Sequence, residues 1–497
     1  MIKKFYLFIL IFVLSVVLVG CSAPGGGYNS GPMGPSYGGM DASDINSEEY
    51  LELQETGYIT TEINNKLNVS LDTSTAAYSN IRRLIKNESF INEDAVNIEQ
   101  MLNYFNYSYV NDSDEQLQSF LEMADCPWNN SKLLSVAIKA KDYELNSTKL
   151  NNFVFLLDVS GSMNSSNKLP LMVEAFNLLI ENLNENDRVS IVTYASGDRV
   201  LLDGAFGYEK TRISAMINDL YASGSTAGSK GIQTAYELAS KYFIEGGNNR
   251  VFLATDGDFN VGISSTSELE KFISKKRETG IYLSLFGFGT GNLKADTMDT
   301  LAQAGNGNYY YIDSILEAQK VFVSELGGTL ETVAKDCKTQ IEFNKDIVEK
   351  YRVIGYENKI LTDEEFENSE TDAGEIGAGH TTVCLVEVIL KEEYTSLDPI
   401  AKCILKYKDV KDNEIEKEVI NELKDITTTP SNDFIFQSAV VEFGLLLRNS
   451  QYKFDANYDN VINRINNENI LNDEYRKEFY ELVQTAKRVY NNEKDYE

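Results

Sequence analysis

Histidine is almost absent from this chain of 497 residues, which has only His380. Serine hydrolases with a Ser-His-Asp triad, Cys-His proteases, H-E-x-x-H metalloproteases and multi-histidine zinc sites all need histidine in a defined partnership. His380 follows a glycine-rich stretch, and no serine or cysteine nucleophile motif lies near it. We therefore interpret it as a structural loop residue rather than a catalytic base, and we expect the protein not to be an enzyme.

Positive charge is also scarce. The chain has 45 Lys and Arg against 76 Asp and Glu, a net charge of −31. Nucleic acids and anionic membrane surfaces attract basic proteins, so this balance argues against both as partners. A cationic ligand, or a partner bridged by a metal ion, fits the charge better. The sequence leaves the oligomeric state open.

Beyond the amino terminus there is no apolar run long enough to cross a bilayer. Residues 1–20 have two lysines, an apolar run and small residues, as a secretory signal peptide does. Leu18-Val19-Gly20-Cys21 resembles a bacterial lipobox, which implies cleavage before Cys21 and attachment of lipid such as palmitate to it. The alternative is a plain signal peptide or an uncleaved anchor. We expect a lipid-anchored protein on the extracytoplasmic face of a cell membrane or outer membrane.

Composition and hydrophobic periodicity divide the rest of the chain into five regions. They predict a Gly/Pro-rich flexible tether (residues 21–47) and a mainly helical segment that ends in a strand (48–150). An α/β domain (151–328), a β-rich domain (336–430) and a helical end (431–497) follow.

The α/β domain is predicted from short apolar runs that alternate with helical patterns. The runs are typical of strands buried on both faces of a parallel sheet, at residues 153–157, 189–192, 250–254 and 281–286. Helical patterns lie between and after them, at residues 169–183, 231–243, 267–278 and 295–304. We expect a doubly wound Rossmann-like domain inserted into a flanking β-rich domain that is built from chain on both of its sides.

Oxygen-bearing side chains follow two of these strands. Asp158, Ser160 and Ser162 come directly after the first strand, and Asp256 follows the third. A glycine-flanked hydroxyl loop that contains Thr226 lies between them in the sequence. Open α/β sheets bind ligands at the carboxyl ends of their strands, and carboxylate and hydroxyl oxygens suit Mg²⁺ or Mn²⁺. The lack of nearby His or Cys argues against zinc.

These five residues resemble the metal-ion-dependent adhesion site of von Willebrand factor type A domains, over roughly residues 151–328. The resemblance implies that Ser160, Ser162 and Thr226 bind the metal through hydroxyls, and that Asp158 and Asp256 bind it directly or through water. Further stretches resemble bacterial lipoproteins in which this domain has a characteristic amino-terminal segment and a carboxyl-terminal extension, at residues 125–129, 353–358 and 372–380.

The expected function is metal-dependent binding or adhesion. A metal held largely by neutral hydroxyls and water keeps its affinity for an external carboxylate, so an acidic residue of a protein partner would complete the site. One alternative is an envelope scaffold whose metal is structural. A less favoured one is a metal-dependent hydrolase, which would need a positioned general base.

Four cysteines besides Cys21 leave the redox state open. An exported chain allows disulfides, and Cys384 to Cys403 is the most plausible bridge if their strands are neighbours. Cys337, Cys384 and Cys403 also fall on the apolar phase of their strands, so buried free thiols are an equal alternative.

Overall fold

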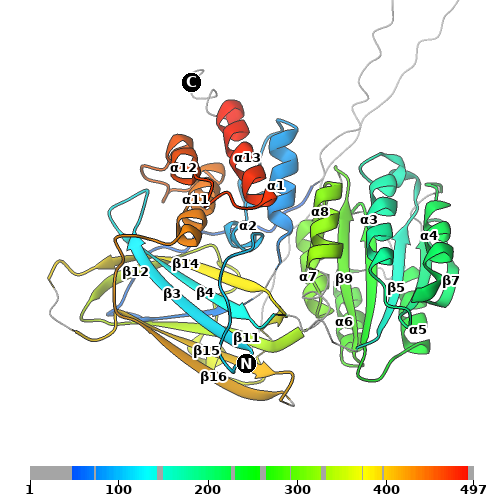
Figure 1. The fold of residues 1–497 in the computed structure, drawn as a ribbon, viewed down its shortest axis with the longest axis horizontal. Coiled ribbons are helices and arrows are strands. Elements are labelled where there is room, and N and C mark those ends of the chain that lie inside the picture. Colours follow the sequence, from blue (N-terminus) through cyan, green and yellow to red (C-terminus); the bar gives the residue numbers. More distant parts are fainter. Residues whose placement is uncertain are drawn as a thin grey trace, which may run out of the picture. The chain divides into compact units, whose positions relative to one another are not determined.

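The computed structural model describes residues 48–71, 74–142, 149–224, 230–257, 265–291, 293–325, 332–371, 373–393, 397–412 and 414–490. The predicted signal peptide, the tether with Cys21, and Thr226 lie outside the described residues. Figure 1 shows the α/β domain, coloured green, beside a β-rich part and a group of helices.

A six-stranded sheet forms the centre of the α/β domain, in the order β10-β9-β8-β5-β6-β7. All neighbouring pairs are parallel except β6 with the edge strand β7, which is antiparallel. The strands are β5 (Asn151–Asp158), β6 (Arg188–Tyr194), β7 (Asp198–Phe206), β8 (Asn248–Thr255), β9 (Ile281–Phe288) and β10 (Tyr309–Ile312). Every residue of β5 and β8 is buried, as the apolar runs predict.

Helices cover both faces of this sheet, and each face has its own hydrophobic core. One core contains residues of α3 (Leu169–Glu181), α4 (Lys210–Asn218), α8 (Ile315–Gln319) and the π-helical turn η4 (Lys320–Ser324). The other contains residues of α5 (Gly231–Lys241), α6 (Thr266–Arg277) and α7 (Ala295–Ala304). The domain is therefore doubly wound, as the sequence predicts.

Two further sheets enclose a second core, to which each contributes alternate side chains. One has the order β1-β12-β14-β4-β3, and the other has the path β13-β11-β15-β16 with β2 paired to β11. The strands before the α/β domain are β1 (Ile59–Thr60), β2 (Lys66–Ser70), β3 (Leu117–Asp125) and β4 (Lys132–Ala140). Those after it are β11 (Thr332–Phe343), β12 (Val348–Ile354), β13 (Gly374–Gly377), β14 (Thr381–Leu390), β15 (Ala401–Asp409) and β16 (Ile415–Leu423). Because β4 pairs with β14, the α/β domain is an insertion in the β-rich domain.

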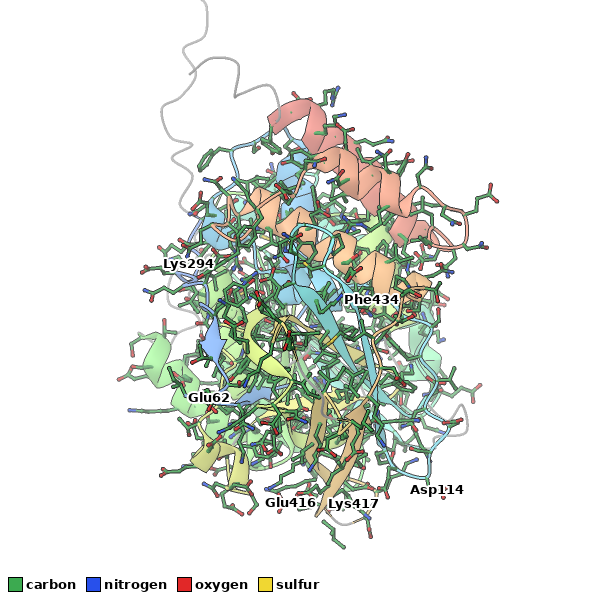
Figure 2. All side chains as sticks on the ribbon, turned by 90° about the vertical axis from the view of Figure 1, so that its left-hand side faces the viewer. Glu62, Asp114, Lys294, Glu416, Lys417 and Phe434 are labelled. Carbon is green, nitrogen blue, oxygen red and sulfur yellow. The ribbon has the colours of Figure 1, made fainter. Side chains whose placement is uncertain are left out.

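Helices from the two ends of the described chain share a third core, which includes Trp128. They are α1 (Ala76–Lys86), η1 (Glu93–Ala95) and α2 (Ile98–Asn103), with α11 (Asn432–Leu447), α12 (Tyr458–Ile465) and α13 (Glu474–Tyr490). A short helix, α10 (Asp363–Glu367), lies on the β-rich domain next to β11. Figure 2 shows Glu62, Asp114 and Glu416 at the outside of the molecule, whereas Phe434 of α11 is buried.

One expectation about the flanking regions was wrong, and one pair of alternatives that the sequence left open is decided. The part of residues 48–150 that was predicted to be helical, up to about residue 125, is not mainly helical, because β1, β2 and β3 lie in it and pair with other strands of the β-rich domain. The strands β14 and β15 that carry Cys384 and Cys403 are in different sheets, so the condition for that disulfide is not met. Both cysteines are buried free thiols, as are Cys126 and Cys337. Among the described residues, no helix is long and apolar enough to cross a membrane.

Candidate metal and protein-binding site

The candidate site lies where the strand order of the sheet reverses direction. From β5 the chain passes outward through β6 and β7, and then returns to β8 on the other side of β5. The connections therefore diverge at the carboxyl ends of β5 and β8, and such a point in an open α/β sheet leaves a crevice for ligands. Asp158 ends β5, and Asp256 directly follows β8.

The first loop holds Asp158 and Ser160 in a tight turn. The backbone N–H of Ser160 donates a hydrogen bond to Asp158 Oδ1 at 2.8 Å, and the two hydroxyls of Ser160 and Ser162 are 2.9 Å apart. Asp158 and Ser160 are buried, whereas Ser162 is exposed. The predicted oxygen donors of this loop are therefore together, with Ser162 on the open side.

The second loop lies against the first. Ser223 donates its backbone N–H to the Val159 carbonyl at 2.8 Å, and Gly161 donates to the Gly224 carbonyl at 3.0 Å. A side chain at Gly161 would place its Cβ 3.1 Å from that Gly224 oxygen, so glycine permits the close approach. Residues 223 and 224, which directly precede the segment of the predicted ligand Thr226, therefore lie at the loop of Asp158 and Ser160. Thr226 itself is outside the described residues.

Asp256 is buried and forms an ion pair with Lys168, whose Nζ lies 2.7 Å from Asp256 Oδ2. Sequence reasoning missed Lys168, because its position just before α3 shows no pattern that separates it from a solvated lysine. Its stem packs against Gly289, where an added Cβ would lie 2.4 Å from Lys168 carbons. Gly289 has a φ of +79°, which favours glycine.

Burial shapes the electrostatics of the two carboxylates. The pKa of Asp158 is raised to about 6, chiefly by burial and in part by the charge of Asp256, while the hydrogen bonds from Ser160 act in the opposite direction. Two carboxylates and the single ammonium of Lys168 leave one net negative charge in a buried setting. Such a site favours a cation.

The donor set fits a hard divalent cation. It consists of two carboxylates and two hydroxyls, with neither imidazole nor thiolate. Within the described ranges, no group of three or more His, Cys, Asp or Glu side chains is placed to hold a metal. A site of the adhesion type differs from such groups because hydroxyls supply most of its ligands.

His380 lies far in sequence from these residues, in the loop between β13 and β14. Its carbonyl accepts a hydrogen bond from Ala140 at 2.9 Å, and its N–H donates to Gly377 at 3.2 Å. Burial lowers the pKa of its imidazole, which keeps the ring neutral at pH 7. The histidine is thus part of a strand connection, as its interpretation as a loop residue requires.

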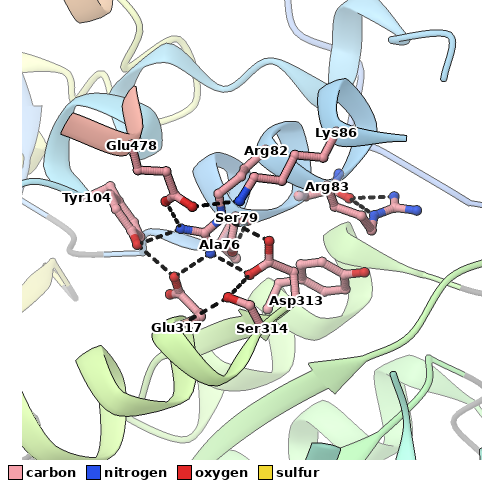
Figure 3. A network of polar contacts seen from close by, with 12 residues as sticks. Ala76, Ser79, Arg82, Arg83, Lys86, Tyr104, Asp313, Ser314, Glu317 and Glu478 are labelled. Carbon is pink, nitrogen blue, oxygen red and sulfur yellow. Dashed lines mark hydrogen bonds and ion pairs between the residues drawn. The ribbon is translucent and has the colours of Figure 1, made fainter. Parts of the chain in front are cut away.

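A buried arginine connects the last helix of the α/β domain to the helices outside it (Figure 3). Arg82 of α1 donates from Nε to Asp313 at 2.8 Å, from one terminal nitrogen to Glu317 at 2.8 Å, and from the other to Glu478 at 2.8 Å. The Tyr104 hydroxyl donates to Glu317 at 2.7 Å and accepts from Arg82 at 3.0 Å. One guanidinium thus joins α8, α13 and α2.

The sheet order, the helices on both faces and the loops at the switch point define a von Willebrand factor type A domain. The model of the von Willebrand factor type A domain matches residues 152–323. A second model, described as von Willebrand factor, matches residues 44–135, and one described as Uncharacterized protein YfbK, C-terminal, matches residues 328–418 and 391–489. Domains of this type point to protein interaction or adhesion and commonly bind a divalent metal.

The chain is 38% identical over 451 residues to the Uncharacterized protein YfbK of Escherichia coli, covering 84% of this chain and 78% of that protein. It therefore belongs to the YfbK family, a bacterial family that combines the A domain with a YfbK carboxyl-terminal domain. It is also 27% identical over 203 residues to the Uncharacterized protein sll0103 of Synechocystis, covering 40% of this chain and 46% of that protein.

Among solved structures, a von Willebrand factor type A protein from Catenulispora acidiphila is similar, with a TM-score of 0.40 and 14% identity. The alignment covers 68% of this chain and 82% of that one.

Proposed function

We propose that this protein is a lipid-anchored surface protein whose A domain binds a protein ligand through a divalent metal. The observation that carries the proposal is the meeting of Asp158, Ser160 and Ser162 with the loop of residues 223–224. We assign Asp158, Ser160, Ser162, Thr226 and Asp256 as metal ligands, direct or through water. The metal is Mg²⁺ or Mn²⁺, and when bound it supplies a positive centre that attracts a carboxylate of the partner.

Charge supports binding rather than catalysis. The net negative charge of the two carboxylates and Lys168 is one, so a divalent cation reverses its sign and makes the site attractive to an acidic side chain. Ser160 and Ser162 are neutral and reduce the metal's charge little, and Lys168 pairs with Oδ2 of Asp256. No histidine or free lysine among the described residues of these loops is placed as a general base.

Metal binding is tested by titrating Mn²⁺ into the full-length protein and measuring free Mn²⁺ by electron paramagnetic resonance. Ser160→Ala should weaken the affinity by about tenfold or more, since mutation of a residue that only hydrogen-bonds to a metal ligand already lowers metal affinity by about 10–100-fold. Ser165→Ala is the matched control, because Ser165 is an exposed serine of the same loop outside the proposed set. Equal affinities in the two variants would contradict the assignment.

Partner binding is tested by capture from the envelope of the source organism with Mg²⁺ and then with EDTA. A partner retained with Mg²⁺, released by EDTA and lost in Asp158→Ala supports adhesion. The second candidate, an envelope scaffold with a structural metal, predicts instead that Asp158→Ala only lowers the melting temperature. Anchoring is tested separately by incorporation of labelled palmitate, which Cys21→Ser should abolish.

A further inference from the structure

A polar cavity lies at the other end of β8 from the proposed metal site. It has a volume of about 410 Å³ and is lined by residues of the A domain and of the β-rich domain. Arg250, near the start of β8, lines it, whereas Asp256 follows the end of that strand. At about 3.3 Å per residue, six residues separate the two sites by about 20 Å.

The lining is positively charged in a protein that is otherwise strongly acidic. Arg250, Arg277 and Lys359 contribute three cations, against the two carboxyl groups of Glu270 and Glu375. Amide side chains add hydrogen-bond donors, among them Asn306 and Asn308. Cations together with neutral donors are the composition that recognises carboxylate or phosphate oxygens.

Arg250 is the side chain that needs an anion. Only 2% of its surface is exposed, and its Nε has no hydrogen-bond partner. One terminal nitrogen donates to Ser284 Oγ at 2.8 Å, and the guanidinium lies 5.5 Å from the ring centre of Tyr282. Among the described residues, no carboxylate lies within 4.0 Å of its nitrogens as an ion pair. A buried charge without a counter-ion is costly.

The carboxyl group of Glu375 attracts the Arg250 guanidinium electrostatically, but it forms its hydrogen bonds with other residues. Its Oε1 accepts from Asn306 Nδ2 at 2.6 Å, and its Oε2 accepts from Thr332 Oγ1 at 3.3 Å. Asn306 in turn accepts from Arg277 at 2.9 Å. These bonds join the carboxyl-terminal ends of α6 and α7 to β11 and β13 across the cavity, so its wall is built from fixed side chains of both domains.

We propose that this cavity binds a small oxyanion, a carboxylate or phosphate group, with Arg250 as its buried counter-ion and Arg277 as its second cation. The proposal does not depend on the metal site, because the two lie at opposite ends of the sheet. A ligand there would touch both the A domain and the β-rich domain, so its binding would stabilise their contact.

The test measures the melting temperature of the full-length protein in a Tris-chloride buffer, with inorganic phosphate or citrate added at constant ionic strength. Either probe should give a saturable rise. Phosphate alone indicates a phosphate-bearing ligand, and citrate alone a carboxylate-bearing one. The absence of a rise with both would overturn the proposal.

The variants separate a site from a general salt effect. Arg250→Met should lose the rise and, without oxyanion, should melt no lower than the wild type, since an unpaired buried charge is gone. Arg277→Gln should raise the half-saturating concentration by about tenfold, the loss of one charge-assisted bond. The Arg277→Gln variant still tests the site if Arg250→Met does not fold. Arg212→Gln is the control, because Arg212 is exposed and pairs with Glu209 elsewhere on the domain. An equal rise in Arg250→Met, Arg277→Gln and Arg212→Gln would refute the site.

Discussion

Arg82 offers a quantitative test of how the A domain is held to the rest of the protein. Its side chain is fully buried and contacts three carboxylates, those of Asp313, Glu317 and Glu478. Arg82→Met keeps most of the apolar stem but leaves these carboxylates without their shared cation. Removing one partner of a buried pair costs about 3–5 kcal/mol, so we expect a loss of that size in the free energy of unfolding.

Lys86→Met is the matched control, because Lys86 is on the same helix and pairs with the same residue, Glu478, at 2.6 Å. Lys86 is 52% exposed, and water compensates a surface cation that is lost, so this variant should cost at most about 1 kcal/mol. Urea denaturation can be followed by the fluorescence of Trp128, the only tryptophan, which shares a core with Tyr104.

A second substitution tests the electrostatic cause. Glu317 is buried, and burial raises the pKa of its carboxyl against the opposing effect of Arg82. Adding Glu317→Gln to Arg82→Met should therefore recover part of the lost stability, since one stranded charge is removed. The reasoning is refuted if Arg82→Met destabilises no more than Lys86→Met.

Three other features give predictions. Burial raises the pKa of Glu375 to about 7, so the folded state holds its proton more tightly than the unfolded state, whose carboxyl has an ordinary value of 4.5. The resulting stabilisation is complete below pH 4.5 and is lost as the pH rises to about 7, at up to about 1.4 kcal/mol per pH unit. The unfolding free energy of Glu375→Gln, subtracted from that of the wild type at pH 5 and again at pH 7.5, should isolate this loss. An equal difference at the two pH values would contradict it. Cys384 and Cys403 should both be alkylated by iodoacetamide in denaturant without reductant, as peptide mapping can show, and a disulfide-linked peptide would disprove free thiols. Gly307→Ala would place a Cβ 1.9 Å from a backbone oxygen, whereas Gly197→Ala meets nothing within 4 Å, so thermal melting should show a large loss only for Gly307→Ala.

The sequence predicted the A domain well because its signals are local. Strands buried on both faces must be continuously apolar, and this is visible at β5 and β8 without any knowledge of their neighbours. The positions of Asp158 and Asp256 follow from the same logic, since the parallel strands that precede them are neighbours and end at the same sheet edge. The fold and the location of the candidate site were therefore determined by sequence.

The flanking domain was harder to predict, because its strands pair across large separations. β3 was expected to belong to a helical segment, and its identity as a strand depends on β4. The pairing of Cys384 with Cys403 assumed adjacent strands, but β14 and β15 belong to two different sheets. The sequence of one strand does not show which distant strand will pair with it, because strand formation depends on packing against those neighbours.

Only the tertiary structure could reveal the charged groups whose partners are remote in sequence. Lys168 meets Asp256 88 residues away, and Arg82 meets Glu478 396 residues away. Most charged side chains are solvated, and a sequence does not show which of them are buried. When one is buried, the loss of its counter-ion strongly lowers the stability of the protein. The sequence thus determined the A domain and the position of its candidate oxygen donors, whereas three-dimensional packing decided which charges are buried, which are paired, and which, as at Arg250, have no carboxylate partner.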